Sequence, residues 1–195
     1  MAFKLWKTFG VFALLVSVTG CGAATNNAGT NNNAPGGSNP ATTPSSGGTK
    51  NAQGTSKWLT VDNSKKSVDL KLEAGVNDGF NFNGYDKGSM IVTVPTGWKV
   101  NATFTNDSSA AHSAVIVPFD QVAKMSGFTP AFSGATTPNP VAGVGQNVAQ
   151  KFSFTADKAG KYGIVCAVPG HDGAGMWDIL VVSGSAKTAS IATTK

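Results

Sequence analysis

The feature that most constrains the fold of this chain is the alternation of apolar residues in several short segments. The alternation runs through 67–72 (SVDLKL), 90–94 (MIVTV) and 98–104 (WKVNATF). Period-two patterns rich in β-branched and aromatic residues are typical of β-strands that bury one face. Further strands are predicted at 113–117, 148–155, 161–166 and 177–182. Turn-forming residues separate about seven short strands, and this spacing predicts an all-β fold of two packed sheets, a β-sandwich.

One stretch within the β-rich region, residues 119–147, does not follow the alternation. It begins with FDQVAKMSGF, which is compatible with a short helix, and continues with a run rich in Pro and Gly. Loops of this length in compact domains tend to be functional or mobile. We therefore expect one folded domain over 57–183 with an insertion around 119–147, followed by a flexible C-terminal tail over 184–195.

The N-terminal segment has the composition of a signal peptide over residues 1–20. Lys4 and Lys7 supply a positive start, and the apolar run over 9–18 is too short to span a bilayer comfortably. The run ends in Val-Thr-Gly-Cys, which resembles the lipobox of bacterial lipoproteins and predicts lipidation of Cys21. An ordinary secretory signal with a chance cysteine is the alternative. Either interpretation sends the protein out of the cytoplasm, and the lipobox predicts an extracytoplasmic lipoprotein anchored in the cell membrane.

Residues 21–56 form a second distinct region, because after Cys21 they contain no large apolar residue. Asn, Gly, Ser, Thr and Pro dominate this segment. Such a composition cannot bury enough surface to offset the chain entropy, which predicts a disordered tether. The composition is equally compatible with a plain spacer that has no functional role.

Charge limits the partners of the folded domain. Between residues 57 and 183 there are ten lysines and ten acidic residues, so the net charge of +5 comes from lysines outside this range. The chain contains no arginine. A nucleic-acid-binding domain would show a basic face with arginine, so nucleic acid is excluded as a partner.

The segment CAVPGHDGAGM carries the most specific chemistry of the chain. It places Cys166, His171 and Met176 at Cys-x4-His-x4-Met spacing between two predicted strands, and His112 precedes them in SAAHSAVIVP. These are the only two histidines, and a lipid on Cys21 would leave Cys166 without a disulfide partner. Two imidazoles, one thiolate and a weak thioether are the ligand set of a mononuclear blue copper site.

Two other kinds of site are compatible with some of these residues. Zinc binds Cys and His, but its structural sites favour more thiolates, and thioether ligation is unusual for it. A cysteine–histidine nucleophile is conceivable, but no acid or amide is evidently placed to orient either histidine, and Met176 would have no role. We therefore predict one copper ion held by His112, Cys166, His171 and Met176.

The chain also resembles a known family in residues outside the ligand set. Residues 80–88 (FNFNGYDKG) and 94–98 (VPTGW) are similar to the signature of the sulfocyanins, a group within the cupredoxins. The ligand-loop spacing and Ser113 beside His112 also resemble rusticyanin. The resemblance covers about residues 67–183 and implies a Greek-key two-sheet β-sandwich of the cupredoxin type.

The resemblance implies a type 1 copper electron-transfer protein rather than an enzyme. Such a protein carries one electron between Cu(I) and Cu(II), here as a monomer between membrane respiratory complexes, a donor and a terminal oxidase. Archaeal sulfocyanins resemble proteins anchored by an apolar helix, whereas here a lipid on Cys21 would anchor the domain. By the same resemblance, His171 would be the ligand nearest the surface. Its expected apolar neighbours are Val168, Pro169, Ala174 and Pro118.

Two further functions are alternatives. A copper-trafficking lipoprotein would bind Cu(I) in an exposed site with several clustered Met or His residues, and Met90 and Met125 show no clustering with Met176. A copper enzyme, such as a nitrite reductase or an oxidase domain, would need a second copper site with further histidines, which the chain does not contain.

Overall fold

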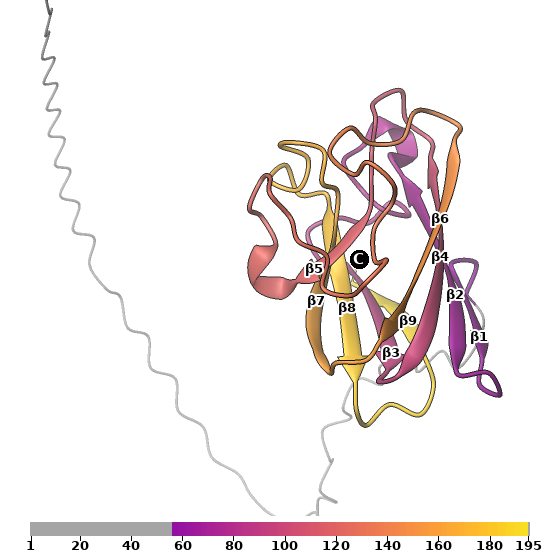
Figure 1. Cartoon of the computed structure of the whole chain (residues 1–195). Coiled ribbons are helices and arrows are strands. Elements are labelled where there is room, and N and C mark those ends of the chain that lie inside the picture. Colours follow the sequence, from indigo (N-terminus) through magenta and orange to yellow (C-terminus); the bar gives the residue numbers. More distant parts are fainter. Residues whose placement is uncertain (1–55, 195) are drawn as a thin grey trace, which may run out of the picture. The chain divides into compact units, whose positions relative to one another are not determined.

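Two β-sheets packed face to face make up the described part of the protein (Figure 1). The computed structural model describes residues 56–194. The first sheet contains, in spatial order, β1 (Leu59–Asp62), β2 (Ser67–Ala74), β4 (Trp98–Asn106) and β6 (Ala149–Ala156). The second sheet contains β5 (Val115–Pro118), β7 (Gly160–Val165), β8 (Trp177–Ser183), β3 (Met90–Pro95) and β9 (Ser190–Thr193). The prediction of an all-β sandwich of two sheets is therefore confirmed.

Both sheets are mixed, because the chain changes sheet at several of its strand connections. β2 pairs in parallel with β4, with Val68 opposite Val100, and β3 pairs in parallel with β8, with Ile91 opposite Ile179. The remaining strand pairs are antiparallel. Parallel neighbours need a crossover connection, and β3, in the second sheet, provides it for β2 and β4. Such strand exchange between layers is typical of sandwiches with Greek-key connections.

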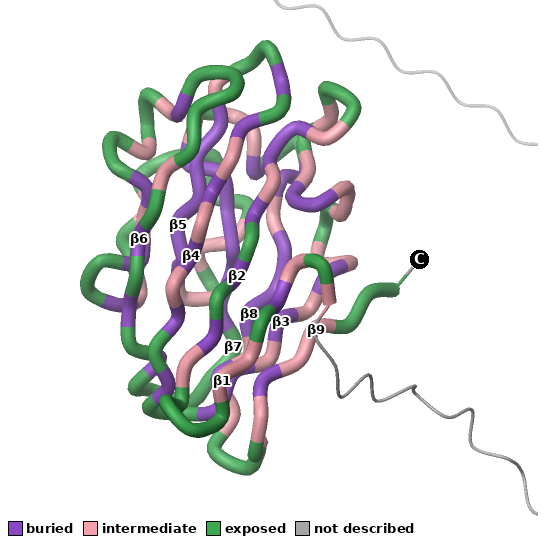
Figure 2. The backbone as a smooth tube through the Cα atoms, turned by 90° about the vertical axis from the view of Figure 1, so that its right-hand side faces the viewer, coloured by how far each residue is buried: buried purple, intermediate pink, exposed green. Residues whose placement is uncertain are grey.

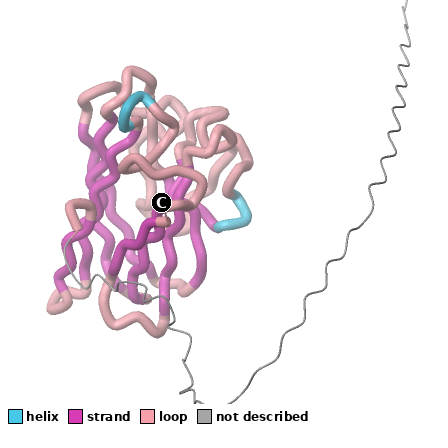
Figure 3. The backbone as a smooth tube through the Cα atoms, turned by 180° about the vertical axis from the view of Figure 1, so that it is seen from behind, coloured by secondary structure: helices cyan, strands magenta, loops and turns pink. Residues whose placement is uncertain are grey.

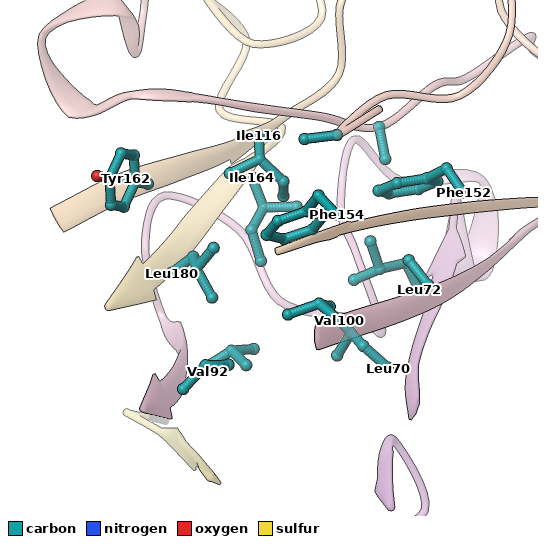
Figure 4. Packing of buried hydrophobic residues seen from close by; sticks show 14 of the residues in the cluster. Leu70, Leu72, Val92, Val100, Ile116, Phe152, Phe154, Tyr162, Ile164 and Leu180 are labelled. Carbon is teal, nitrogen blue, oxygen red and sulfur yellow. The ribbon is translucent and has the colours of Figure 1, made fainter. Parts of the chain in front are cut away.

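The hydrophobic core lies between the sheets and follows from the alternation in the sequence. In β2, Val68, Leu70 and Leu72 are each 1% exposed, whereas Asp69 and Lys71 between them are exposed. Figure 2 shows the same change between buried and exposed positions along neighbouring strands. Complete burial of one such aliphatic side chain contributes about 1.5–3 kcal/mol. Figure 4 shows core side chains from both sheets, including Leu70, Leu72, Val100, Phe154, Val92, Ile164 and Leu180.

Three details differ from the sequence-based expectations. The tail over 184–195 was expected to be flexible, but Ser190–Thr193 form β9 and pair with β3, so that prediction is wrong for these residues. The short helix expected from residue 119 is a single 3-10 turn, η2 (Phe119–Gln121). Strand β1 was not predicted at all. It pairs with only one strand, β2, and three of its four residues are half-buried or exposed.

The loops at one end of the sandwich position the candidate site. Tight turns join β1 to β2 and β3 to β4 at the opposite end, where Ser67 lies opposite Lys99. Longer loops follow β2, β4 and β7, and both 3-10 turns, η1 (Val76–Asp78) and η2, lie in loops (Figure 3). A hydrogen bond from the Lys87 N–H to the Gly175 carbonyl joins the loop after β2 to the loop after β7.

The predictions for the signal peptide, for Cys21 and for the tether fall on residues 1–55, which lie outside the described residues. Within the described part of the chain, no helix combines the length and the apolar character needed to cross a membrane.

Candidate metal centre

Three of the four predicted ligands converge at one point at the loop end of the sandwich. The Cys166 Sγ lies 3.5 Å from the His171 Nδ1 and 3.9 Å from the His112 Nδ1. The two Nδ1 atoms lie 3.1 Å apart. Cys166 directly follows β7, His171 lies in the β7–β8 loop, and His112 comes from the connection between β4 and β5. The fold therefore brings together donors from two separate segments, as the sequence predicts.

The loop that carries Cys166, His171 and Met176 is closed by its own backbone. The Cys166 N–H donates to the Met176 carbonyl over 3.1 Å, and the Met176 N–H donates to the His171 carbonyl over 3.0 Å. Gly170 has a φ of 85°, which permits the tight turn just before His171. The Met176 side chain is fully buried. Met176 thus forms the base of the loop, with its backbone bonded to the backbones of both other ligands in the motif.

His112 is held by a backbone pair with the insertion. The His112 N–H donates to the Val144 carbonyl over 3.2 Å, and the Val144 N–H donates back over 2.6 Å. Gly75 packs against the imidazole with a φ of 74°, and a Cβ there would lie 3.1 Å from the ring and 2.2 Å from the Ser108 Cβ. Only glycine fits this position without displacing a neighbour. His112 is 1% exposed.

Ser113 contacts the sulfur of Cys166 from the side of the His112 segment. Its N–H donates to the Cys166 Sγ over 3.4 Å, and its Oγ lies 3.8 Å from the same sulfur. The Ser113 Oγ also accepts a 2.9 Å hydrogen bond from the Ala167 N–H. Hydrogen bonds to a ligating sulfur orient it and tune its electron density, so Ser113 has a role in the site beyond packing.

Burial controls the charge of the three donors. It lowers the pKa of His112 to about 4, with a further contribution from the charge of His171. Burial also lowers the pKa of His171. It raises the pKa of the Cys166 thiol, and hydrogen bonding from Ser113 opposes this rise. Near neutral pH the metal-free protein therefore presents two neutral imidazoles, and a metal ion that binds must displace the thiol proton.

The spacing of the donors suits one transition-metal ion. Bonds of about 2.0 Å to nitrogen and 2.3 Å to sulfur place donors roughly 3.1–3.8 Å apart around a single ion, close to the separations of 3.1, 3.5 and 3.9 Å. These three residues are the one group of His, Cys, Asp or Glu side chains in the described residues that is arranged to hold a metal. A soft thiolate with two imidazoles favours copper over zinc, and the buried Met176 of the same loop supplies a thioether of the kind that copper accepts.

Phe80 is a neighbour of the site that sequence reasoning did not assign to it. Its ring centroid lies 4.7 Å from that of His171 and 6.2 Å from that of His112. Phe80 is nevertheless 45% exposed. It is the first residue of the FNFNG segment, which was the available signal. Phe80 therefore covers part of both imidazoles at the protein surface.

Three of the four expected apolar neighbours of His171 belong to its own loop. Val168 is half-buried, and Pro169 and Ala174 are exposed. Pro118 instead lies at the end of β5 remote from His112, opposite Tyr162, so it does not fit the expectation.

Comparison with known proteins shows that most of the chain is similar to sulfocyanins. A family model described as the sulfocyanin (SoxE) domain matches residues 54–193. Sulfocyanin of Sulfolobus acidocaldarius is 32% identical over 126 residues, which cover 61% of this chain and 63% of that relative. The matched region thus spans less than two thirds of the relative's length.

Solved structures with similar chains include two auracyanins and rusticyanin. Reduced auracyanin from Roseiflexus castenholzii is 26% identical, with a TM-score of 0.46 and coverage of 59% of this chain and 96% of that chain. Auracyanin A from Chloroflexus aurantiacus, a "blue" copper protein, is 22% identical, with a TM-score of 0.44 and coverage of 60% and 99%. Reduced rusticyanin is 23% identical, with a TM-score of 0.40 and coverage of 60% and 77%.

Proposed function

The chain belongs to the sulfocyanin family of blue copper cupredoxins, and on this premise we propose that it is a one-electron carrier in an extracytoplasmic respiratory chain. The observation that carries the proposal is the cluster of His112, Cys166 and His171, two of them buried and one half-buried, whose donor atoms all lie within 4.8 Å of one another. Copper held by two imidazoles, a thiolate and a weak thioether supplies one-electron exchange between Cu(I) and Cu(II).

The surrounding protein supports this role by holding the donors in place. The His112 segment is paired with Val144, and the ends of the ligand loop are joined through Cys166 and Met176. Ser113 contacts the sulfur from the opposite segment. A site that is formed before the metal binds changes little when an electron arrives or leaves, which keeps the barrier to transfer low.

His171 is the donor through which a partner would exchange electrons. It is half-buried, whereas His112 is 1% exposed and Cys166 is fully buried. The exposed apolar side chain of Phe80 lies beside it. A small apolar surface suits redox partners that bind transiently and bury little area.

The same proposal includes attachment to the cell membrane through a lipid on Cys21. It also includes two partners, a donor complex and a terminal oxidase. They are supported by the Val-Thr-Gly-Cys segment and by the tether composition of 21–56. A role as a carrier rather than an enzyme is supported by the histidine count, since both histidines of the chain lie in one cluster.

The test is a redox titration of the copper-loaded protein, followed by mixing of the reduced protein with respiring membranes from its source organism. The proposal predicts a reversible transition of one electron per chain and oxygen-dependent reoxidation by the membranes. A protein that stays reduced in their presence would not be a respiratory carrier. Rapid loss of Cu(I) to a chelator that leaves other blue copper proteins loaded would favour the trafficking alternative.

A further inference from the structure

The 119–147 insertion contacts the ligand loop on both sides of His171. We propose that this insertion fixes the position of His171, and that Asp172 is the positioning residue that holds the two together. The inference rests on the proposed function for its redox consequence only, since the contact itself belongs to the metal-free protein. It assigns a role to a segment whose composition alone gave none.

The carboxylate of Asp172 is the centre of this contact. Its Oδ2 accepts a 2.7 Å hydrogen bond from the Ala123 N–H, and its Oδ1 accepts a 3.0 Å hydrogen bond from the Met125 N–H. Asp172 is 1% exposed. Its two hydrogen-bond partners lie 49 and 47 residues away from it in the chain. Hydrogen bonds to an ionised carboxylate are about twice as strong as bonds between neutral groups. Both oxygens of a buried carboxylate are thus used to hold one short segment of the insertion.

The residue on the other side of His171 makes a third bond to the same segment. The Gly170 N–H donates to the Met125 carbonyl over 3.2 Å. The Met125 side chain also lies over the loop, since a Cβ at Gly173 would come within 3.0 Å of the Met125 Cγ. The β7–β8 loop and the segment after η2 accordingly lie on the same side of the sandwich (Figure 1). His171 is therefore flanked on both sides by residues bonded to the insertion.

The backbone of the insertion adopts an unfavourable conformation to make these bonds. Ala123 has a φ of 65° and Met125 a φ of 67°, a left-handed region that residues with a Cβ rarely adopt. Such a conformation persists only where its surroundings impose it. The N–H groups of these same two residues are the donors to Asp172, so the carboxylate stabilises this conformation.

The far end of the insertion holds the other histidine. Val144 forms the backbone pair with His112, and a Cβ at Gly143 would contact the Val168 side chain at 2.9 Å. One inserted segment thus contacts both histidine-bearing segments, which otherwise belong to distant parts of the chain. The two imidazoles are carried by these two loops. Because the insertion bonds to both loops, it limits how far the imidazoles can separate.

The test compares Asp172→Asn with Asp120→Asn in the full chain. The asparagine keeps the shape of Asp172, but its amide N–H₂ would face a backbone N–H and could not accept its bond. Asp120 is an exposed carboxylate of the same insertion, so its variant removes the same charge without touching the contact. Amide hydrogen exchange of the metal-free protein should accelerate at least tenfold at Ala123 and Met125 in Asp172→Asn, and should be unchanged in Asp120→Asn.

The second readout is the copper-loaded protein. Asp172→Asn should shift or broaden the thiolate-to-copper absorption band and slow electron self-exchange several-fold, whereas Asp120→Asn should leave both unchanged. Unchanged amide exchange in Asp172→Asn overturns the contact. Faster exchange with an unaltered band and self-exchange rate overturns the positioning role. Absence of the band in the wild-type protein would contradict the proposed function and leave the exchange test intact.

A second variant covers the case in which Asp172→Asn does not fold. Ala123→Gly keeps the N–H donor and removes the penalty for a positive φ. It should raise the protection factors of the amides at positions 123 and 125, and a decrease would contradict the inference.

Discussion

The packing of Gly75 against His112 leads to a prediction that separates a steric contact from backbone conformation. In Gly75→Ala the new Cβ would lie 2.2 Å from the Ser108 Cβ and 3.1 Å from the His112 ring, and the backbone φ is 74°. A positive φ costs an alanine about 1 kcal/mol, and overpacking a filled site costs a further 1–3 kcal/mol. The expected loss is therefore about 2–4 kcal/mol in the free energy of unfolding.

Gly97→Ala is the matched control for Gly75→Ala. Gly97 also has a positive φ, 84°, but apart from its own chain neighbours no heavy atom lies within 4 Å of the position of its Cβ. The free energy of unfolding of Gly97→Ala should fall by only about 1 kcal/mol, because only the penalty for a positive φ applies. The assay is urea unfolding of both metal-free variants, with the midpoint compared at constant m-value. Copper affinity should fall in Gly75→Ala only, because only there is a ligand displaced.

Equal losses of stability in the two glycine variants would refute this reasoning. They would mean that Ser108 and His112 can move aside at no cost, and that the ligand His112 is not held by close packing. A loss of stability in Gly75→Ala with unaltered copper affinity would show that the ring recovers its position after the backbone has adjusted.

Three further predictions concern individual groups of the site. The pKa of His112 is lowered to about 4 from its ordinary 6.5, so the stability that the neutral ring contributes is present above pH 6.5 and lost as the pH falls towards 4. The free energy of unfolding of the metal-free protein, measured by urea unfolding, should therefore fall by about 3 kcal/mol over this range. The same pH change should lower the free energy of unfolding less in His112→Gln. Met176→Leu should retain copper and raise the reduction potential, measured by voltammetry; complete loss of copper would give Met176 more than a weak axial role. Ser113→Ala leaves the buried Ala167 N–H without its acceptor, so the free energy of unfolding should drop by about 1–3 kcal/mol, and no change would mean that water replaces the hydroxyl.

The strands that could be predicted are those with one face in the core. The pattern predicts β2 and β4 because their inward positions are apolar and their outward positions are polar. β1 and β9 are short, each pairs with one strand only, and their side chains are mostly half-buried or exposed. β1 alternates over only four residues (LTVD) and β9 (SIAT) does not alternate, so the pattern in each strand is too short to identify it.

The candidate donors could be identified because their chemistry is specific to the residue type. Cys166, His171 and His112 are rare residues at a recognisable spacing, and the fold brings them together. The contacts of Phe80 and Asp172 could not be predicted, since each joins loops that are far apart in the chain. Asp172 directly follows His171 in the sequence, yet its carboxylate binds backbone groups of the insertion.

The account depends most directly on whether His112, Cys166 and His171 hold one copper ion. The decisive measurement is the visible absorption spectrum of the Cu(II)-loaded protein together with its two single cysteine variants. The account predicts one copper per chain and an intense thiolate-to-copper band, lost in Cys166→Ser and kept in Cys21→Ser. A colourless Cu(II) form of the wild-type protein, or a band that survives in Cys166→Ser, would contradict it.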